Sequence, residues 1–268
     1  MTQPFVREIS IDYSDDELDA LASAFGRTDL ARMPERVGDD PVRRAQHQTA
    51  LRGLVARRAI MLSGTAARPQ IAFLDPHATL LGSWLRAPAV ATLRTETREA
   101  VRSVTLLVGD EVIVHQASIP GQAIQRLTAY GLDGAADLLA SELDLSTAAP
   151  PADDAQPIEV TARMVTAALD AFSRREPAPD CVPTAAAEIL HARISSGSLT
   201  ITARSGSVRT ADRWSWIDAG TLGLWRVRGG DATPTLSLEP AQPSALRTEI
   251  AEMWAQLSVS NEIPSSEV

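Results

Sequence analysis

The sequence predicts an α+β protein, in which a largely antiparallel sheet is flanked by helices and the chain forms two pseudo-symmetric halves. One observation behind this is the stretch Trp214–Trp254, where strands that alternate apolar and polar residues are followed by a turn at Gly229–Asp231 and a closing helix. A second is the stretch Val101–Tyr130, which repeats the order strand, Gly109–Asp110 turn, strand and helix. Two related halves and a chance recurrence of a common pattern both stay open.

The first half, residues 1–145, is expected to begin with a strand at Phe5–Ile11. A helix follows at Ser14, because Ser14 and Glu17 have the spacing of a capping box, which satisfies the first amide donors of a helix. Asp40 is expected to cap the next helix, with a proline at its first position. No element is assigned to residues 57–69. The other predicted elements are a helix at 76–85 capped by Asp75, a strand at 89–97, a hairpin at 101–117 and helices at 121–130 and 134–143.

A segment rich in Pro, Ala and Asp, residues 146–157, has no large apolar side chain to bury and is expected to link the two halves. The second half, residues 158–258, is expected to end in a flexible tail at 259–268. Its predicted elements are helices at 160–172 and 184–192, strands near 199–203, 214–227 and 236–238, and a last helix that includes Leu246, Ile250, Met253, Trp254 and Leu257 on one face.

Three tryptophans, Trp214, Trp216 and Trp225, lie in the predicted strands of the second half. Helices before and after these strands must cover at least one face of the sheet, so the tryptophans are expected in the core. Only an exposed tryptophan would instead indicate a recognition platform.

Bulk composition limits the class of protein. The chain has 268 residues, 44% of them hydrophobic, a formal net charge of -9 and a single cysteine, Cys181. The acidic balance argues against a nucleic-acid partner, and the lone cysteine excludes an internal disulfide. No apolar run approaches the length of a membrane-spanning helix and no signal segment is evident at the amino terminus, so a cytoplasmic protein is expected, without membrane insertion.

Catalytic signatures are absent from the sequence: it contains no nucleophile elbow, Walker loop, dinucleotide fingerprint or zinc-binding helix motif. Its histidines, which are His47, His77, His115 and His191, lack the spacing that brings two imidazoles to one metal. The acidic run of Asp15, Asp16 and Glu17 is explained by the first turn of a helix. We therefore expect no catalytic, cofactor-binding or metal-binding residues and no cofactor.

An enzyme or small-ligand protein stays open as an alternative, with Asp75, His77 and His115 as its nearest candidates. Asp75 could orient His77 as a base, but the role of Asp75 as a helix cap explains the same residues without catalysis. A deep polar pocket containing the three residues would favour the enzyme. A dimeric scaffold protein is a further alternative.

Taken in order, the chain resembles the EspG family of proteins associated with mycobacterial type VII (ESX) secretion. The resemblance is carried by Glu8–Phe25, by the stretches ALRGLV at 50–55, WLRAPAVATLRTE at 84–96 and VTLLVGDEVIV at 104–114, and by LTITARSG at 199–206 together with residues 223–254. These stretches cover most of the chain as patterns rather than as specific motifs.

This resemblance implies a cytosolic chaperone without catalysis or cofactor. Members of the family bind the apolar helical tip of a PE–PPE heterodimer, keep it soluble and assign it to one secretion apparatus. The implied partner is therefore a helical secreted protein or heterodimer, PE/PPE- or WXG-like, while the protein-binding residues stay unknown. One departure concerns the connection between Thr97 and Val101, which is very short, whereas members that bind PPE proteins tend to carry a longer loop there.

Overall fold

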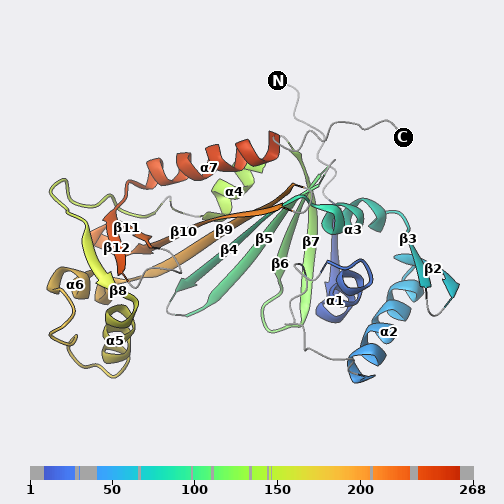
Figure 1. The fold of residues 1–268 in the computed structure, drawn as a ribbon, viewed down its shortest axis with the longest axis horizontal. Coiled ribbons are helices and arrows are strands. Elements are labelled where there is room, and N and C mark those ends of the chain that lie inside the picture. Colours follow the sequence, from blue (N-terminus) through green and yellow to red (C-terminus); the bar gives the residue numbers. More distant parts are fainter. Residues whose placement is uncertain are drawn as a thin grey trace. The chain divides into compact units, whose positions relative to one another are not determined.

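The computed structural model describes the chain in several ranges (Figure 1). These are residues 9–27, 30, 41–65, 68–97, 99–109, 112–132, 135–143, 145, 147–205, 208–229 and 235–259. The predicted cap Asp40, the turn residues Gly230 and Asp231, and residues 260–268 of the expected tail lie outside them. None of the helices in these ranges is both long and apolar enough to cross a membrane.

Ten strands form one large antiparallel sheet, and helices accompany it, which confirms the predicted α+β class. By internal contacts the chain divides into two units, which we describe separately. Unit 1 comprises residues 1–90 and 104–135, and unit 2 comprises residues 91–103 and 136–268. The predicted halves, with their boundary at 146–157, stay a prediction.

The strand order in unit 1 is β1 (Ile9–Ser14), β7 (Ile124–Gly131), β6 (Val112–Ser118) and β5 (Val101–Val108, in unit 1 from Val104 on). Its helices are α1 (Asp15–Ala24), α2 (Pro41–Ala56) and α3 (His77–Arg86), and a separate two-stranded sheet joins β2 (Ile60–Thr65) to β3 (Arg68–Phe73). The core lies between sheet and helices and includes buried Tyr13, Leu21, Leu54, Trp84 and Leu127.

Helix α1 begins as predicted. The Ser14 hydroxyl accepts a hydrogen bond from the Glu17 amide (3.2 Å), and the Glu17 carboxylate accepts one from the Ser14 amide (2.8 Å). This capping box satisfies two donors that the first helical turn would otherwise leave without partners. Asp15 in the same turn accepts a hydrogen bond from the side chain of Gln125, so the acidic run has a structural role.

The helix predicted at 121–130 is wrong, because this segment is strand β7. It pairs with β1 on one side and with β6 on the other, as in the register Ile11 to Leu127 and Val114 to Ala129. Leu127, Thr128 and Ala129 are buried in succession, so both faces of the strand are covered. A central strand of this kind does not show the alternation by which a half-exposed strand is identified in a sequence.

The cap predicted for α3 is also wrong. Pro76 occupies the cap position, no side-chain hydrogen bond caps this helix among the described residues, and Asp75 is exposed. The Asp75–Pro76 peptide bond is cis. At its other end α3 is held by Arg27, a loop residue whose buried guanidinium donates to the carbonyl oxygens of Leu85 and Ala87.

Unit 2 contains β4 (Ala89–Thr97, in unit 2 from Ala91 on), followed in the sheet by five further strands. These are β9 (Ser195–Ser205), β10 (Val208–Asp218), β11 (Leu224–Arg228), β12 (Thr235–Pro240) and β8 (Ile158–Thr161). The helices of this unit are α4 (Ala135–Leu143), α5 (Ala162–Ser173), α6 (Thr184–Ala192), the short 3-10 helix η2 (Gly220–Leu222) and α7 (Pro243–Val259).

One expectation for unit 2 needs correction. The helix expected from residue 160 begins only after Thr161, whose hydroxyl accepts from the Met164 amide, because Val160 belongs to β8 and pairs with Leu236. The segment 146–157, whose role as a link between two halves stays a prediction, contacts the rest of unit 2: Pro151 is buried and the Ala149 carbonyl accepts a hydrogen bond from the amide of Leu224. Short apolar groups pack this segment where a large one is absent.

Candidate functional site

The two histidines of the enzyme alternative have different partners in unit 1. The Tyr13 hydroxyl and His77 Nδ1 are 2.6 Å apart, and Arg57 lies over the Tyr13 ring at 5.2 Å from its centroid. The ring of His115 instead packs edge-on against Tyr130, with the centroids 6.1 Å apart. Within the described ranges, no group of three or more His, Cys, Asp and Glu side chains is placed to hold a metal ion.

The protonation states of Tyr13 and His77 indicate that their contact has a structural role. Burial and the nearby Arg57 guanidinium lower the pKa of His77, and burial raises the pKa of Tyr13 well above its usual value. At neutral pH a neutral imidazole therefore accepts a hydrogen bond from a phenol. Because Tyr13 is fully buried, the bond satisfies a hydroxyl that has left water.

The three tryptophans of unit 2 belong to the core, as predicted. Their exposed fractions are 4% for Trp214, 2% for Trp216 and 6% for Trp225. Trp225 donates its indole hydrogen to the Leu222 carbonyl (2.9 Å), and Trp214 donates to Glu249 of α7 (3.2 Å). The tryptophans therefore do not form an exposed recognition platform.

An apolar row does reach the surface at one margin of unit 1. Phe25 at the end of α1 stacks on Phe73 of β3, with centroids 5.6 Å apart and planes inclined by 25°. On the same face of β3, Ile71 pairs with Leu62 of β2. Phe25 is 44% and Leu62 38% exposed, while Ile71 and Phe73 are half-buried and pack on the core. We call these four residues the apolar margin.

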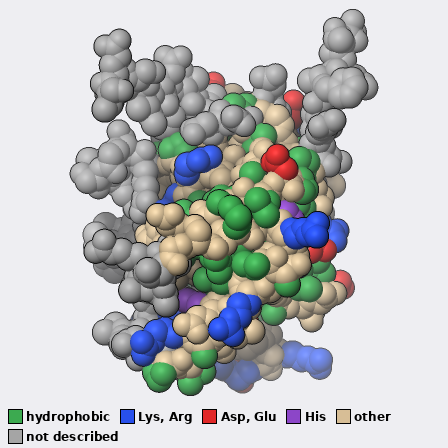
Figure 2. All heavy atoms as spheres, turned by 90° about the vertical axis from the view of Figure 1, so that its right-hand side faces the viewer, with side chains coloured by type: hydrophobic (Ala, Val, Ile, Leu, Met, Phe, Trp, Pro, Cys, Tyr) green, Lys and Arg blue, Asp and Glu red, His purple; other side chains and the backbone are tan. Residues whose placement is uncertain are grey.

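Figure 2 shows the side of the molecule that carries β2 and β3, and hydrophobic side chains gather near the centre of that face with both basic and acidic groups around them. All basic side chains other than histidine are arginines in this chain. Arg57 and Arg58 follow α2 and lead into β2, and both are exposed. An apolar centre with arginine near it is a composition typical of protein interfaces.

The sequence did not identify this margin, because residues 57–69 received no assignment. The usable signal was the pair of short apolar runs Ile60–Leu62 and Ile71–Phe73 on either side of Gly64, which is typical of a hairpin. Phe25 continues the apolar spacing of Leu18, Leu21 and Ala22, which are buried in α1, yet it lies just past the last helical turn and is 44% exposed.

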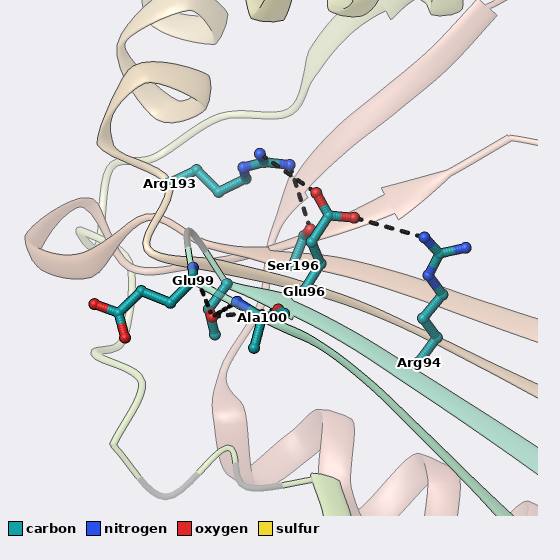
Figure 3. A network of polar contacts seen from close by, with 7 residues as sticks. Arg94, Glu96, Glu99, Ala100, Arg193 and Ser196 are labelled. Carbon is teal, nitrogen blue, oxygen red and sulfur yellow. Dashed lines mark hydrogen bonds and ion pairs between the residues drawn. The ribbon is translucent and has the colours of Figure 1, made fainter. Parts of the chain in front are cut away.

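A tight turn joins β4 to β5 at the edge of unit 2. The Thr97 hydroxyl oxygen accepts hydrogen bonds from the amides of Glu99 (3.3 Å) and Ala100 (3.2 Å), and the Thr97 amide donates to the Ala100 carbonyl (2.9 Å). The short connection expected from the sequence is therefore present as a closed turn, drawn in Figure 3.

Next to this turn, two arginines flank one carboxylate. Figure 3 shows Glu96 between Arg94 of the same strand and Arg193 from the end of α6. Both Arg–Glu distances are 3.9 Å, and Arg193 also lies 3.4 Å from the Ser196 hydroxyl. These distances exceed the range of about 2.7–2.9 Å for a charge-assisted hydrogen bond. The cluster is a loosely held surface network, and exposed pairs of this kind contribute little to stability.

No family model matches the sequence, and no match to a curated protein is found. Among solved structures, the chain is similar to the Mycobacterium tuberculosis type VII secretion system chaperone EspG5, solved in complex with the PE25–PPE41 dimer. The TM-score is 0.50 at 12% sequence identity, and the likeness covers 97% of this chain and 99% of that chain. At this identity the comparison shows a shared fold, which confirms the EspG-like fold expected from the sequence.

Proposed function

We propose that this chain is a non-enzymatic cytoplasmic chaperone or adaptor that binds a helical client, PE/PPE- or WXG-like, and keeps it soluble for export by a type VII secretion system. The observation that carries this proposal is the fold similarity to the EspG5 chaperone along nearly the whole of both chains. The chain-long resemblance of the sequence to the EspG family supports the same proposal.

The apolar margin is the surface on which we place the client. A chaperone of this kind must cover apolar helical surface that would otherwise aggregate, so it must itself present apolar groups to solvent. Phe25 and Leu62 present apolar side chains to solvent. Phe25 stacks on the half-buried Phe73, and Leu62 pairs with the half-buried Ile71. Burying a large apolar side chain completely stabilises a contact by about 1.5–3 kcal/mol, so two half-exposed anchors can decide binding.

The turn at Thr97–Ala100 supports this placement. If family members bind PPE proteins through a longer loop at the corresponding position, a turn closed by the Thr97 side chain leaves no chain to extend over a client. The client of this protein would then be bound elsewhere, and the apolar margin lies on unit 1, whereas the turn belongs to unit 2.

Co-expression with the helical-hairpin proteins encoded beside its gene, followed by gel filtration, tests the proposal. We expect one such protein to co-elute with the chain and to become insoluble when expressed alone. Failure of all of them to co-elute would contradict the proposed function.

A pair of variants then tests the surface. Phe25→Arg and Leu62→Arg should each abolish co-elution, because they place a charge where apolar burial is needed. Ile194→Arg is the matched control, since Ile194 is 52% exposed but lies in unit 2, away from the margin residues in the chain. If the two margin variants retain the client as well as the control does, the function stands but the surface is wrong.

A further inference from the structure

Unit 2 contains a preformed groove beside α6. Its cavity volume is about 550 Å³, and its walls come from α6, η2, Trp225 and the segment 152–158. Its lining includes Asp154, Ile158, Ala185, Glu188, Leu222 and Trp225. We call this cavity the α6 groove. Its volume lies within the range of about 300–1,000 Å³ that is usual for binding pockets.

Hydrogen bonds and close packing hold the walls in place. The Trp225 indole donates to the Leu222 carbonyl (2.9 Å), and the Asp218 carboxylate accepts from the Gly220 amide at the start of η2 (3.0 Å). Gly223, at φ 88°, packs directly against Pro151, where a side chain would clash with the backbone. The groove is therefore formed before any ligand arrives, which reduces the ordering cost of binding.

The groove combines an apolar floor with an acidic rim. Ile158, Ile189 and Trp225 supply apolar surface, and Leu222 is 39% exposed at its edge. Asp154 and Glu188 are exposed on the rim, and the described residues that line the groove include no arginine. A cationic group next to an apolar one complements such a site, because rim charges of one sign select partners of the other.

We propose that the α6 groove binds a basic amphipathic helix of a partner protein. One or two apolar side chains on successive turns of that helix would enter the groove, and arginine or lysine one turn away would pair with Asp154 and Glu188. The inference does not rest on the proposed chaperone function.

Titration of the full chain with two labelled helical peptides tests the proposal by fluorescence anisotropy. Both peptides carry leucine on one face; the first has arginine on the other face and the second has glutamate. We expect saturable micromolar binding of the arginine peptide and about tenfold weaker binding of the glutamate peptide. Equal affinity for both peptides, or no saturable binding of either, overturns the proposal.

Three variants then locate the site. Glu188→Arg and Asp154→Arg should each weaken the arginine peptide about five- to tenfold, and Ala185→Trp should block it by filling the groove. Asp170→Arg, an exposed position on α5 outside the lining, makes the same change of net charge and should leave affinity unchanged. Phenethylamine tests the same chemistry in a small molecule. If it binds more tightly than the peptide, or if the groove variants behave like the control, a helix-binding groove is wrong.

Discussion

The two units satisfy the polar atoms of their buried aromatic residues in different ways. In unit 1 the partners are other side chains: His77 for the Tyr13 hydroxyl and Gln116 for the indole of Trp84 (2.9 Å). In unit 2 the Trp225 indole uses a backbone carbonyl, and the Trp216 ring occupies space left by Gly197 on the neighbouring strand. Trp214 is an exception in unit 2, because its indole donates to a side chain, the partly exposed carboxylate of Glu249.

This difference determines how each unit responds to change. A side-chain partner can be removed by substitution or altered by pH, which leaves a buried donor without an acceptor. A backbone partner cannot be removed in this way, and a ring packed on a glycine is sensitive to volume instead. Unit 1 should therefore be sensitive to polarity and pH, and unit 2 to the size of side chains.

The largest effect is expected from Gly197→Ala in unit 2. A Cβ at this position would overlap the Trp216 ring, whose rigid core environment cannot absorb it, and we expect a loss of about 3 kcal/mol in the free energy of unfolding. Urea denaturation measures this. Gly131→Ala is the control, because nothing lies within 4 Å of a Cβ there. Equal unfolding free energies of the two variants would contradict the prediction that unit 2 is sensitive to side-chain size.

A somewhat smaller effect is expected from Gln116→Leu in unit 1. The variant keeps the volume but leaves the buried indole hydrogen of Trp84 without its acceptor, which should cost about 2 kcal/mol. Gln242→Leu, at an exposed position before α7, should change the unfolding free energy little. A stable Gln116→Leu protein would show that the side-chain partners of unit 1 are dispensable.

Two histidines should make the stability of unit 1 depend on pH. Burial and Arg57 lower the pKa of His77 in the folded chain, whereas unfolding returns it to about 6.5. The unfolded state therefore binds the proton of His77 more readily than the folded state. The contribution of neutral His77 to the free energy of unfolding is complete above the unfolded pKa and is lost as pH falls through the folded pKa. His47, also in unit 1, has its pKa lowered by burial and Arg43 and acts in the same direction.

Unfolding free energies between pH 7 and pH 5 should therefore fall, and His77→Gln should reduce the slope. His47→Gln should reduce it independently. Hydrogen exchange followed by peptide should place the loss of protection in unit 1. If the protein that carries both His77→Gln and His47→Gln shows the same dependence of unfolding free energy on pH, other groups cause the pH response.

The smallest effects are expected from the surface carboxylates of each unit. The hydrogen bond from exposed Arg126 lowers the pKa of Asp12; burial acts to raise that of Glu249, but Arg226 and Trp214 outweigh it and lower it. Both carboxylates stabilise the folded chain at pH values above their unfolded pKa of about 4. This stabilisation is lost as pH falls through their lower folded pKa values.

Asp12→Asn should change stability least, because solvent and salt screen its pair. Glu249→Gln should cost more, because the Arg226 side chain is only 15% exposed and would lose its partner. Unfolding at low and high salt measures both variants. A larger loss for Asp12→Asn would reverse this ranking.

Local signals predicted most of the elements that depend on a few neighbouring residues. Ser14 and Glu17 predicted the start of α1, and Leu246, Ile250 and Trp254 on one helical face predicted α7, because caps and helical faces are contained in a few turns. The segment 121–130 was misassigned as a helix, since Ile124 and Leu127 have a spacing that helices and buried strands share.

The sequence was sufficient to predict the α+β class, the capped helix α1, the β5–β6 hairpin, the burial of the three tryptophans and the short connection after Thr97. These follow from interactions within a few residues or from the free energy of burying large apolar groups. Tertiary structure alone decided that 124–131 is a central strand, that Tyr13 pairs with His77, and that Phe25 and Leu62 reach the surface in one row. Each of these depends on partners far away in the chain, whose positions no local pattern contains.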